Sequence, residues 1–204
     1  MASTPIEICN YAANMLGAAS ITSFADGTTA SKAFATTYEM TRDAELRGPG
    51  VWSFAVARTT LAALATVPAS GPYGQQFELP ADCLRVLMAG DWWPGSDQSD
   101  YRTAPPNADY LVEGGMLLCD QAAPLSLRYV AKITDTTRYD AHFTMMLAAK
   151  LAWRNCERLT QSKEKRQLAI TEYKQARSEA VRTAALELPP QFAADDTWIL
   201  SRMQ

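Results

Sequence analysis

Apolar positions near the start of the chain recur at the spacing of one helix face. Thr4, Pro5 and Glu7 are typical of a helix start: Thr4 can cap the first turn, and Glu7 can bond back to the Thr4 backbone. The spacing predicts a helix that ends at Gly17, where a left-handed residue is needed. Its predicted buried stripe is narrow and consists of Cys9, Ala12, Ala13 and Leu16.

A second helix is predicted after the polar segment ADGTTA. Thr28 or Thr29 can cap it, and Gly48-Pro49-Gly50 ends it abruptly. The apolar positions that fall near one face of this helix are Ala30, Phe34, Tyr38 and Leu46.

From about residue 51 to 133 the hydrophobic period changes to two, which predicts strands. Trp52 and Phe54 stand two apart, so we expect both rings on one face of the first strand. We predict that this pair packs the join between a helical layer and a β layer, and does not bind a ligand. Gly114-Gly115, between two apolar runs, predicts a tight hairpin. In a later run, Leu125, Leu127 and Tyr129 fall on one side.

Residues 90–109 are rich in Gly, Pro, Ser and Asp and predict a long exposed loop. The loop also carries three large aromatic residues, Trp92, Trp93 and Tyr101. Aromatic side chains are enriched where proteins bind one another, so these three are candidate partner contacts. The alternative is that the tryptophans fold back on the β layer.

Residues 134–186 return to helical spacing, with a join at Thr160 to Ser162. The first of the two predicted helices has apolar positions at Phe143, Met146, Leu147, Leu151 and Leu159. The second has Leu168, Tyr173, Ala176, Ala180 and Ala184. Between residues 140 and 186 nine Lys and Arg stand against five Asp and Glu, and their interspersed spacing is typical of a solvated face.

The predicted fold class is therefore α+β. Residues 1–50 and 134–186 form a helical bundle, residues 51–133 an inserted antiparallel β region, and residues 187–204 an extended C-terminal arm. Pro189-Pro190 cannot continue the helix, and the arm carries apolar anchors without a core of its own. Its candidate docking residues are Phe192, Trp198, Ile199, Leu200 and Arg202. The alternative is that the arm folds back on its own helices.

Composition and charge exclude several classes of function. A net charge of -3 and a pI of about 5.2 provide no overall basic field for nucleic acid. No apolar run reaches the length of a membrane span, and the first residues predict no secretory signal. The scattered Cys9, Cys83, Cys119 and Cys156 are read as free thiols in a reducing compartment.

Enzyme chemistry has little support in the residues. His142 is the single histidine, which rules out a His-rich metal site, and its place at a helix start favours a surface or capping role. We predict no catalytic, metal-binding or cofactor-binding residues and no cofactor. A pair of loop carboxylates acting as a small hydrolase stays open as an alternative.

The order of several segments is more specific than any one of them. The chain runs through IEICNYAANMLGAASITSF, DGTTASKAFATTYEMTRDAELR, WSFA, ARTTLA and FELPADCLRV. It continues with YLVEGGMLLCD, LSLRYVAK and LAAKLAWRNCERLTQSKEKRQ. From Ile6 to about Ala184 this series resembles the head-to-tail adaptor family of tailed bacteriophages, also called tail tubular protein A in short-tailed phages. Ser53, where the family often has Asn, and the loop 90–109 depart from it.

The resemblance implies a structural protein of the virion neck or tail, assembled in the host cytoplasm. Members form a dodecameric ring that binds the portal protein and continues the DNA channel. The ring gives the tail nozzle or another tail protein its attachment surface, and double-stranded DNA passes through without sequence-specific binding. The arm would then dock on the portal or a neighbouring subunit, and Trp92, Trp93 and Tyr101 would contact the next tail protein. The second hypothesis is a DNA-binding module that uses the basic C-terminal helices.

Overall fold

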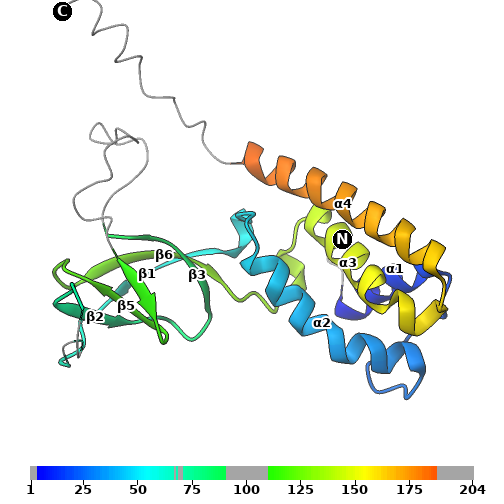
Figure 1. Cartoon of the computed structure of the whole chain (residues 1–204), viewed down its shortest axis with the longest axis horizontal. Coiled ribbons are helices and arrows are strands. Elements are labelled where there is room, and N and C mark those ends of the chain that lie inside the picture. Colours follow the sequence, from blue (N-terminus) through cyan, green and yellow to red (C-terminus); the bar gives the residue numbers. More distant parts are fainter. Residues whose placement is uncertain (1–3, 67, 69–70, 91–109, 188–204) are drawn as a thin grey trace, which may run out of the picture. The chain divides into compact units, whose positions relative to one another are not determined.

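The computed structural model describes residues 4–66, 68, 71–90 and 110–187. The described chain is α+β, as predicted, and it divides into two compact units (Figure 1). The helical unit comprises Met1–Val56 and Ala131–Leu188, and the β unit comprises Ala57–Val130. The β unit is thus an insertion between the second and third helices of the helical unit.

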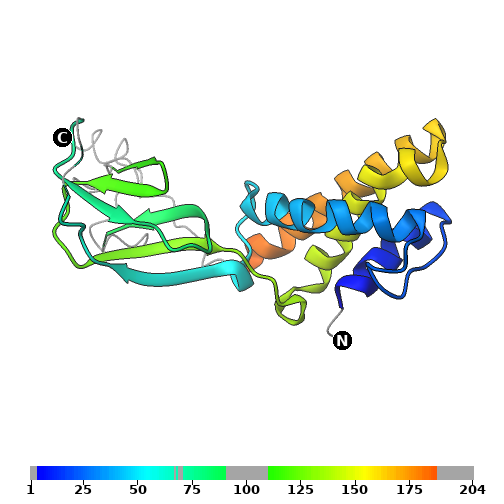
Figure 2. The same ribbon diagram turned by 90° about the horizontal axis from the view of Figure 1, so that it is seen from below.

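Helix α3 (Ala141–Thr160) is the centre of the helical unit. Helices α1 (Pro5–Leu16), α2 (Thr29–Arg47) and α4 (Lys163–Leu186) all pack against it. Figure 2 shows the same unit from below, with α2 in front of α4. Because neighbours cover α3 on three sides, nine of its 20 residues are buried, and it forms the core of this unit.

The predicted ends of α1 are confirmed. The Thr4 hydroxyl accepts a hydrogen bond from the Glu7 amide at 3.2 Å, and the Thr4 amide donates to Glu7 Oε2 at 2.7 Å. These two bonds form the capping box that the sequence predicts. Gly17 has a φ of 67°, so a residue without a β-carbon closes the helix. The four predicted stripe residues are all buried.

Helix α2 also begins and packs as predicted. Thr28 is its N-cap, and the Thr28 hydroxyl accepts from the Ser31 amide at 3.1 Å. Ala30, Phe34, Tyr38 and Leu46 are buried. The same face also buries two charged residues, Arg42 and Glu45.

Helix α4 corrects one prediction. Leu168 was expected in the buried stripe, but it is 57% exposed, and its neighbour Ala169 is buried instead. The helix packs through a narrow row of mostly small side chains, and the row consists of Ala169, Tyr173, Ala180 and Ala184. Leu168 lies about 100° around the helix from Ala169, which places it outside this row.

The first predicted strand begins later than expected. Trp52 and Phe54 were predicted on one face of a strand, but Ser53–Ala55 form a short 3₁₀ helix, η1, and Trp52 is its N-cap. Strand β1 begins only at Val56. The reason lies in a tertiary contact: the Trp52 indole N–H donates to the Glu45 carbonyl oxygen at 3.2 Å, which keeps the chain beside the end of α2.

Two three-stranded sheets make up the described β unit. One has the order β1-β6-β3, and the other has the order β2-β5-β4. The bounds are β1 Val56–Leu61, β2 Gln75–Glu78, β3 Cys83–Ala89, β4 Leu111–Glu113, β5 Met116–Cys119 and β6 Leu125–Ala131. Both sheets contribute to the core of this unit, with Leu61, Phe77, Leu117, Leu125 and Leu127 among the buried side chains.

The hairpin predicted at Gly114-Gly115 is confirmed. Strands β4 and β5 pair antiparallel, with Glu113 opposite Met116. Gly114 and Gly115 have φ values of 55° and 82°, and two positive values in a two-residue turn match the right-handed twist of the strands. Leu125, Leu127 and Tyr129 are buried on β6, again as predicted.

Candidate interaction sites

An aromatic cluster lies where the helical chain passes towards β1. The Trp52 and Phe54 rings both meet the Phe143 ring of α3 edge-on, with centroids 5.0 and 5.1 Å apart. Tyr139 adds a fourth ring, 5.0 Å from Phe143 and 5.4 Å from Phe54. Edge-to-face pairs at these distances add stabilisation beyond simple burial. Because Trp52 is 2% exposed, its ring packs the core and has little surface for a ligand.

Gly50, in the predicted breaker, has a packing role beside this cluster. A β-carbon added to Gly50 would lie 3.3 Å from the Trp52 ring, closer than ordinary contact. The Gly-Pro-Gly sequence therefore ends α2 and also leaves room for the indole. The Ser53 hydroxyl hydrogen-bonds the Glu187 carboxylate just beyond the end of α4, which ties η1 to the last helix.

The predicted docking residues lie outside the described part of the chain. This applies to the loop residues Trp92, Trp93 and Tyr101, and to the arm residues Phe192, Trp198, Ile199, Leu200 and Arg202. Their roles stay predictions.

A buried charge network joins three helices. The Tyr173 hydroxyl on α4 lies 3.0 and 3.1 Å from the two carboxylate oxygens of Glu45 on α2. The Lys150 ammonium on α3 lies 3.4 Å from Glu45 Oε1. The side chains of Glu45 and Lys150 are 10% and 15% exposed, so water screens this pair weakly, and removal of either partner would leave a charge buried.

Two aromatic rings cover the Lys150 ammonium. It lies 4.1 Å from the centroid of the Tyr173 ring and 4.4 Å from that of the Trp153 ring. Both distances are within cation–π range. Tyr173 therefore stabilises the ion pair twice, through its hydroxyl group on Glu45 and through its ring on Lys150.

Burial raises the pKa of the Tyr173 hydroxyl, and the charge of Glu45 and the hydrogen bond to it raise this pKa further. The charges of Arg177 and Arg154 act in the opposite direction. The phenol is therefore protonated at neutral pH and serves as the donor to Glu45.

This network was not predicted from the sequence. A signal was present on α2: Glu45 follows the buried Tyr38 by seven residues, which is two helical turns, so it falls on the same face. A charged residue in register with a buried stripe indicates a partner inside the fold. The identity of that partner depends on α3 and α4, which come a hundred residues later.

A cavity of about 440 Å³ lies beside the network, between the end of α2 and the middle of α4. We refer to it as the α2–α4 pocket. It is lined by Ala44, Glu45, Gly48, Pro49, Tyr173, Lys174 and Arg177. Two cationic side chains, Lys174 and Arg177, thus line this cavity. The one carboxylate in the lining, that of Glu45, already pairs with Lys150.

Arg42 and Asp43 form a second ionic contact on α2. Arg42 Nε donates to Asp43 Oδ1 at 2.8 Å, and Lys132 Nζ lies 2.9 Å from Asp43 Oδ2. Burial by itself would raise the pKa of Asp43, but the hydrogen bonds and charges of Arg42 and Lys132 outweigh it and lower this pKa. Asp43 is therefore ionised at neutral pH and ties α2 to the residue that follows β6.

The β unit has its own basic feature. A cavity of about 340 Å³ is lined in part by Arg58 of β1 and Arg128 of β6. Burial and the charge of Arg58 lower the pKa of Arg128. The two guanidinium groups therefore lie near one another on this sheet.

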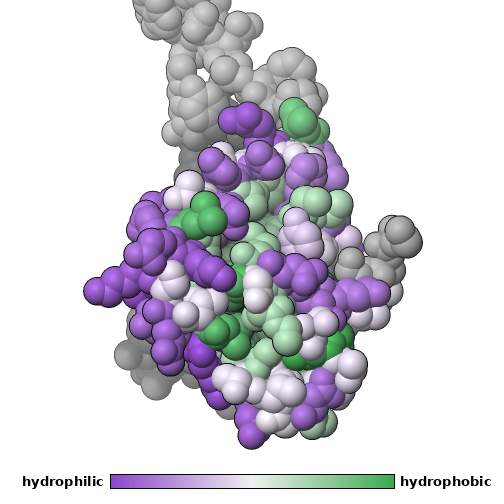
Figure 3. All heavy atoms as spheres, turned by 90° about the vertical axis from the view of Figure 1, so that its right-hand side faces the viewer, coloured by the Kyte–Doolittle hydropathy of each residue, from purple (hydrophilic) through white to green (hydrophobic). Residues whose placement is uncertain are grey.

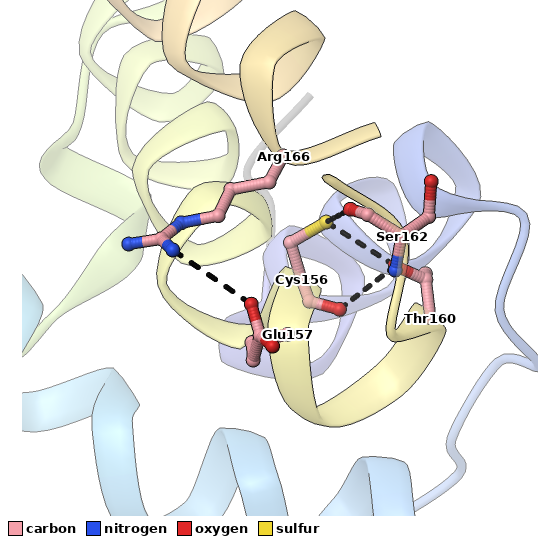
Figure 4. Close-up of polar contacts among 5 residues, drawn as sticks. All are labelled: Cys156, Glu157, Thr160, Ser162 and Arg166. Atoms are coloured by element: carbon pink, nitrogen blue, oxygen red, sulfur yellow. Dashed lines mark hydrogen bonds and ion pairs between the residues drawn. The ribbon is translucent and has the colours of Figure 1, made fainter. Parts of the chain in front are cut away.

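The junction of α3 and α4 lies at the predicted position. Figure 3 shows the surface of the helical unit at this end, where small apolar patches lie between hydrophilic side chains. The Thr160 hydroxyl donates to the Cys156 carbonyl oxygen at 2.8 Å and lies 3.3 Å from the Cys156 sulfur (Figure 4). Arg166 of α4 reaches back to Glu157 of α3, with 3.7 Å between Nη1 and Oε2. Gln161, with a left-handed φ of 52°, makes the turn between the two helices, and these contacts lie on either side of it.

Cys156 and His142 cannot act as a nucleophile–base pair in this fold. They stand fourteen residues apart on the same helix, which is about 21 Å at 1.5 Å per residue. Cys156 is buried, whereas His142 is exposed at the start of α3. In the part of the chain that the structure describes, no group of three or more His, Cys, Asp or Glu is placed to hold a metal ion.

Neither a model of a known protein family nor a curated protein matches this chain. Among the described helices, none combines the length and the apolar character that a lipid bilayer crossing requires.

Proposed function

We propose that the protein is a structural head-to-tail adaptor of a tailed bacteriophage. The observation that carries this proposal is the place of the resembling segments in the fold. Taken in order, they supply α1, α2, η1, β1, β2, β3, the β4–β5 hairpin, β6 and α3, through to the start of α4. The likeness thus follows the elements of both units and does not rest on one short motif.

In this role the subunits assemble into a dodecameric ring in the neck of the virion, after synthesis in the host cytoplasm. The ring binds the portal protein on one side and the tail nozzle or another tail protein on the other. Double-stranded DNA passes through its lumen without sequence-specific binding. An acidic subunit suits this role, because a basic lumen would hold the phosphates and slow the passage of DNA.

The arm from residue 187 is proposed to dock on the portal or a neighbouring subunit, and the loop 90–109 is proposed to contact the tail. No chemistry is required of the protein in this role. The buried aromatic cluster and the Glu45 network fit it, because both stiffen a subunit that must hold its shape under the load of assembly.

Electron microscopy of the protein mixed with its portal tests the proposal. The expected result is a ring bound to one face of the portal, seen in negative stain. Portal particles that stay bare at protein concentrations of several micromolar would rule the adaptor out.

The second candidate is a DNA-binding module, and the observation that favours it is the set of exposed cations on α4, among them Lys163, Arg166 and Lys174. Salt-dependent retention of duplex DNA in a gel by the purified chain would support it. We expect no such retention near physiological salt, because the chain as a whole is acidic.

A further inference from the structure

The α2–α4 pocket is surrounded by more positive than negative charge. Lys174 and Arg177 line it directly. Arg154 of α3 is close enough for its charge to act on the Tyr173 hydroxyl at the pocket wall. The one carboxylate in the lining, Glu45, is already paired with Lys150. The pocket and its rim therefore carry a clear excess of positive charge.

These cations are available for a partner. Among the described residues, Arg154, Lys174 and Arg177 take part in no ion pair, whereas Arg166, further along α4, reaches Glu157. Arg154 and Lys174 are exposed and Arg177 is half-buried, so a bound chain could reach all three. An arginine can bind a carboxylate through two parallel hydrogen bonds, and a lysine adds a point charge beside it.

The shape of this basic surface favours a peptide over a nucleic acid. Lys174 and Arg177 are three residues apart, on the flank of α4 that turns towards α2. At about 100° per residue, Glu172 and Glu179 lie about 140–160° round the same helix from these two cations, almost on its opposite side. A cavity of about 440 Å³ admits single side chains, so an acidic side chain can enter it, whereas the phosphates of a DNA duplex are held on a wide, stiff backbone.

We propose that the α2–α4 pocket binds an acidic segment of a partner protein, with Asp or Glu carboxylates held by Lys174 and Arg177. Ala44 and Pro49 add apolar residues to the lining beside these two cations. The Glu45 carboxylate is paired with the Lys150 ammonium and accepts from the Tyr173 hydroxyl, so its repulsion of an incoming carboxylate is reduced. The proposal does not depend on the adaptor role, because it follows from the charges and shape of the helical unit.

The test uses the full chain and a fluorescein-labelled peptide of alternating glutamate and serine, with its glutamine counterpart and a short DNA duplex as comparison probes. Binding is followed by fluorescence anisotropy at about 50 mM salt and again at about 300 mM. The test variant is Lys174→Glu/Arg177→Glu. The matched control is Lys32→Glu/Arg182→Glu, which changes the net charge equally with two exposed cations that do not line the pocket.

We expect the glutamate peptide to bind the natural chain and the glutamine peptide not to bind. The pocket variant should bind the glutamate peptide at least about tenfold more weakly than the control variant does, and circular dichroism at the temperature of the binding assay checks that both variants are folded. An equal loss in both variants would overturn the proposal, since the attraction would then follow net charge alone. DNA that binds more tightly than the peptide, and loses affinity in the pocket variant, would also overturn it and assign the pocket to nucleic acid.

Discussion

The hydroxyl group of Tyr173 lies 3.0 Å from the Glu45 carboxylate, although the two residues are 128 positions apart in the chain. This contact joins the last described helix to the second helix, across the insertion of the entire β unit. Lys150 completes the contact from α3. The two sequence segments of the helical unit are therefore joined by a buried ionic network of their own.

Replacing Tyr173 with Phe should destabilise the helical unit by about 1–3 kcal/mol. The ring and its contact with Lys150 are kept, but Glu45 loses its hydroxyl donor while it stays largely buried. Urea denaturation followed by circular dichroism measures the change. The control is Tyr11→Phe, at a residue that is 48% exposed, and it should leave the free energy of unfolding within about 0.5 kcal/mol of the natural value. Equal stability of the two variants would contradict the role given to the hydroxyl.

The raised pKa of Tyr173 predicts that the stability of the folded chain falls at alkaline pH. Burial first, and then Glu45, raise the pKa of Tyr173 in the folded chain above its ordinary value of 10.0. The folded state therefore holds this proton more tightly than the unfolded state does. The resulting stabilisation is fully present below about pH 10 and is lost as the pH rises through the folded pKa.

Tyr38 and Tyr139 also have raised pKa values, so the natural chain alone cannot isolate Tyr173. The free energy of unfolding should fall more steeply above about pH 10 in the natural chain than in the Tyr173→Phe variant. Parallel slopes in the two proteins would mean that Tyr173 does not contribute.

Trp52 is predicted to be the most costly aromatic to remove. Trp52→Ala should lower the free energy of unfolding by about 3–5 kcal/mol, because it leaves a cavity against Phe143. Trp52→Phe keeps a ring but leaves the Glu45 carbonyl without its indole donor, so about 1–2 kcal/mol is expected. Chemical denaturation measures the free energy of unfolding of both variants. The loss in Trp52→Phe reports the hydrogen bond, and the further loss in Trp52→Ala reports the packing of the ring. A loss below about 1 kcal/mol for the alanine variant would show that the indole is not part of the core.

Local patterns predicted local structure well in this chain. The capping box at Thr4 and Glu7, the end of α1 at Gly17 and the hairpin at Gly114 each depend on residues a few positions apart. Such features are decided by backbone geometry and short-range hydrogen bonds, which the sequence displays directly.

Features decided by tertiary contacts were not predicted. The 3₁₀ turn at Trp52 depends on a bond to the end of α2, and the exposure of Leu168 depends on which row of α4 meets α3. The Glu45 network needs three helices at once. Of the predicted sites, only Trp52 and Phe54 fall in the described chain, and those on the loop 90–109 and on the arm stay predictions.

Gly17 offers a test of backbone strain at the end of α1. Gly17→Ala places a β-carbon on a residue with a φ of 67°, which should destabilise the chain by about 1–2 kcal/mol. The added carbon would lie 3.4 Å from Lys165 Nζ, an ordinary contact, so the effect arises from the backbone. Gly17→Asn is the matched variant, because asparagine tolerates left-handed geometry, and it should lose less stability in thermal denaturation. If the Gly17→Asn variant were less stable than the Gly17→Ala variant, backbone strain at this position would not be the cause of the loss.

The last prediction concerns the arm, which lies outside the described residues. Deletion of residues 189–204 should leave the helical content unchanged and abolish binding to the portal. Pro189-Pro190 restricts the chain and lowers the entropy lost when the arm docks, and each buried apolar anchor can contribute about 2 kcal/mol before ordering costs. A matched variant keeps the length of the arm but replaces Trp198, Ile199 and Leu200 with Ser, and it should fail in the same way. Circular dichroism checks the fold, and co-sedimentation with purified portal measures binding. If the truncated chain still forms portal-bound rings with the natural affinity, the arm is not the docking element.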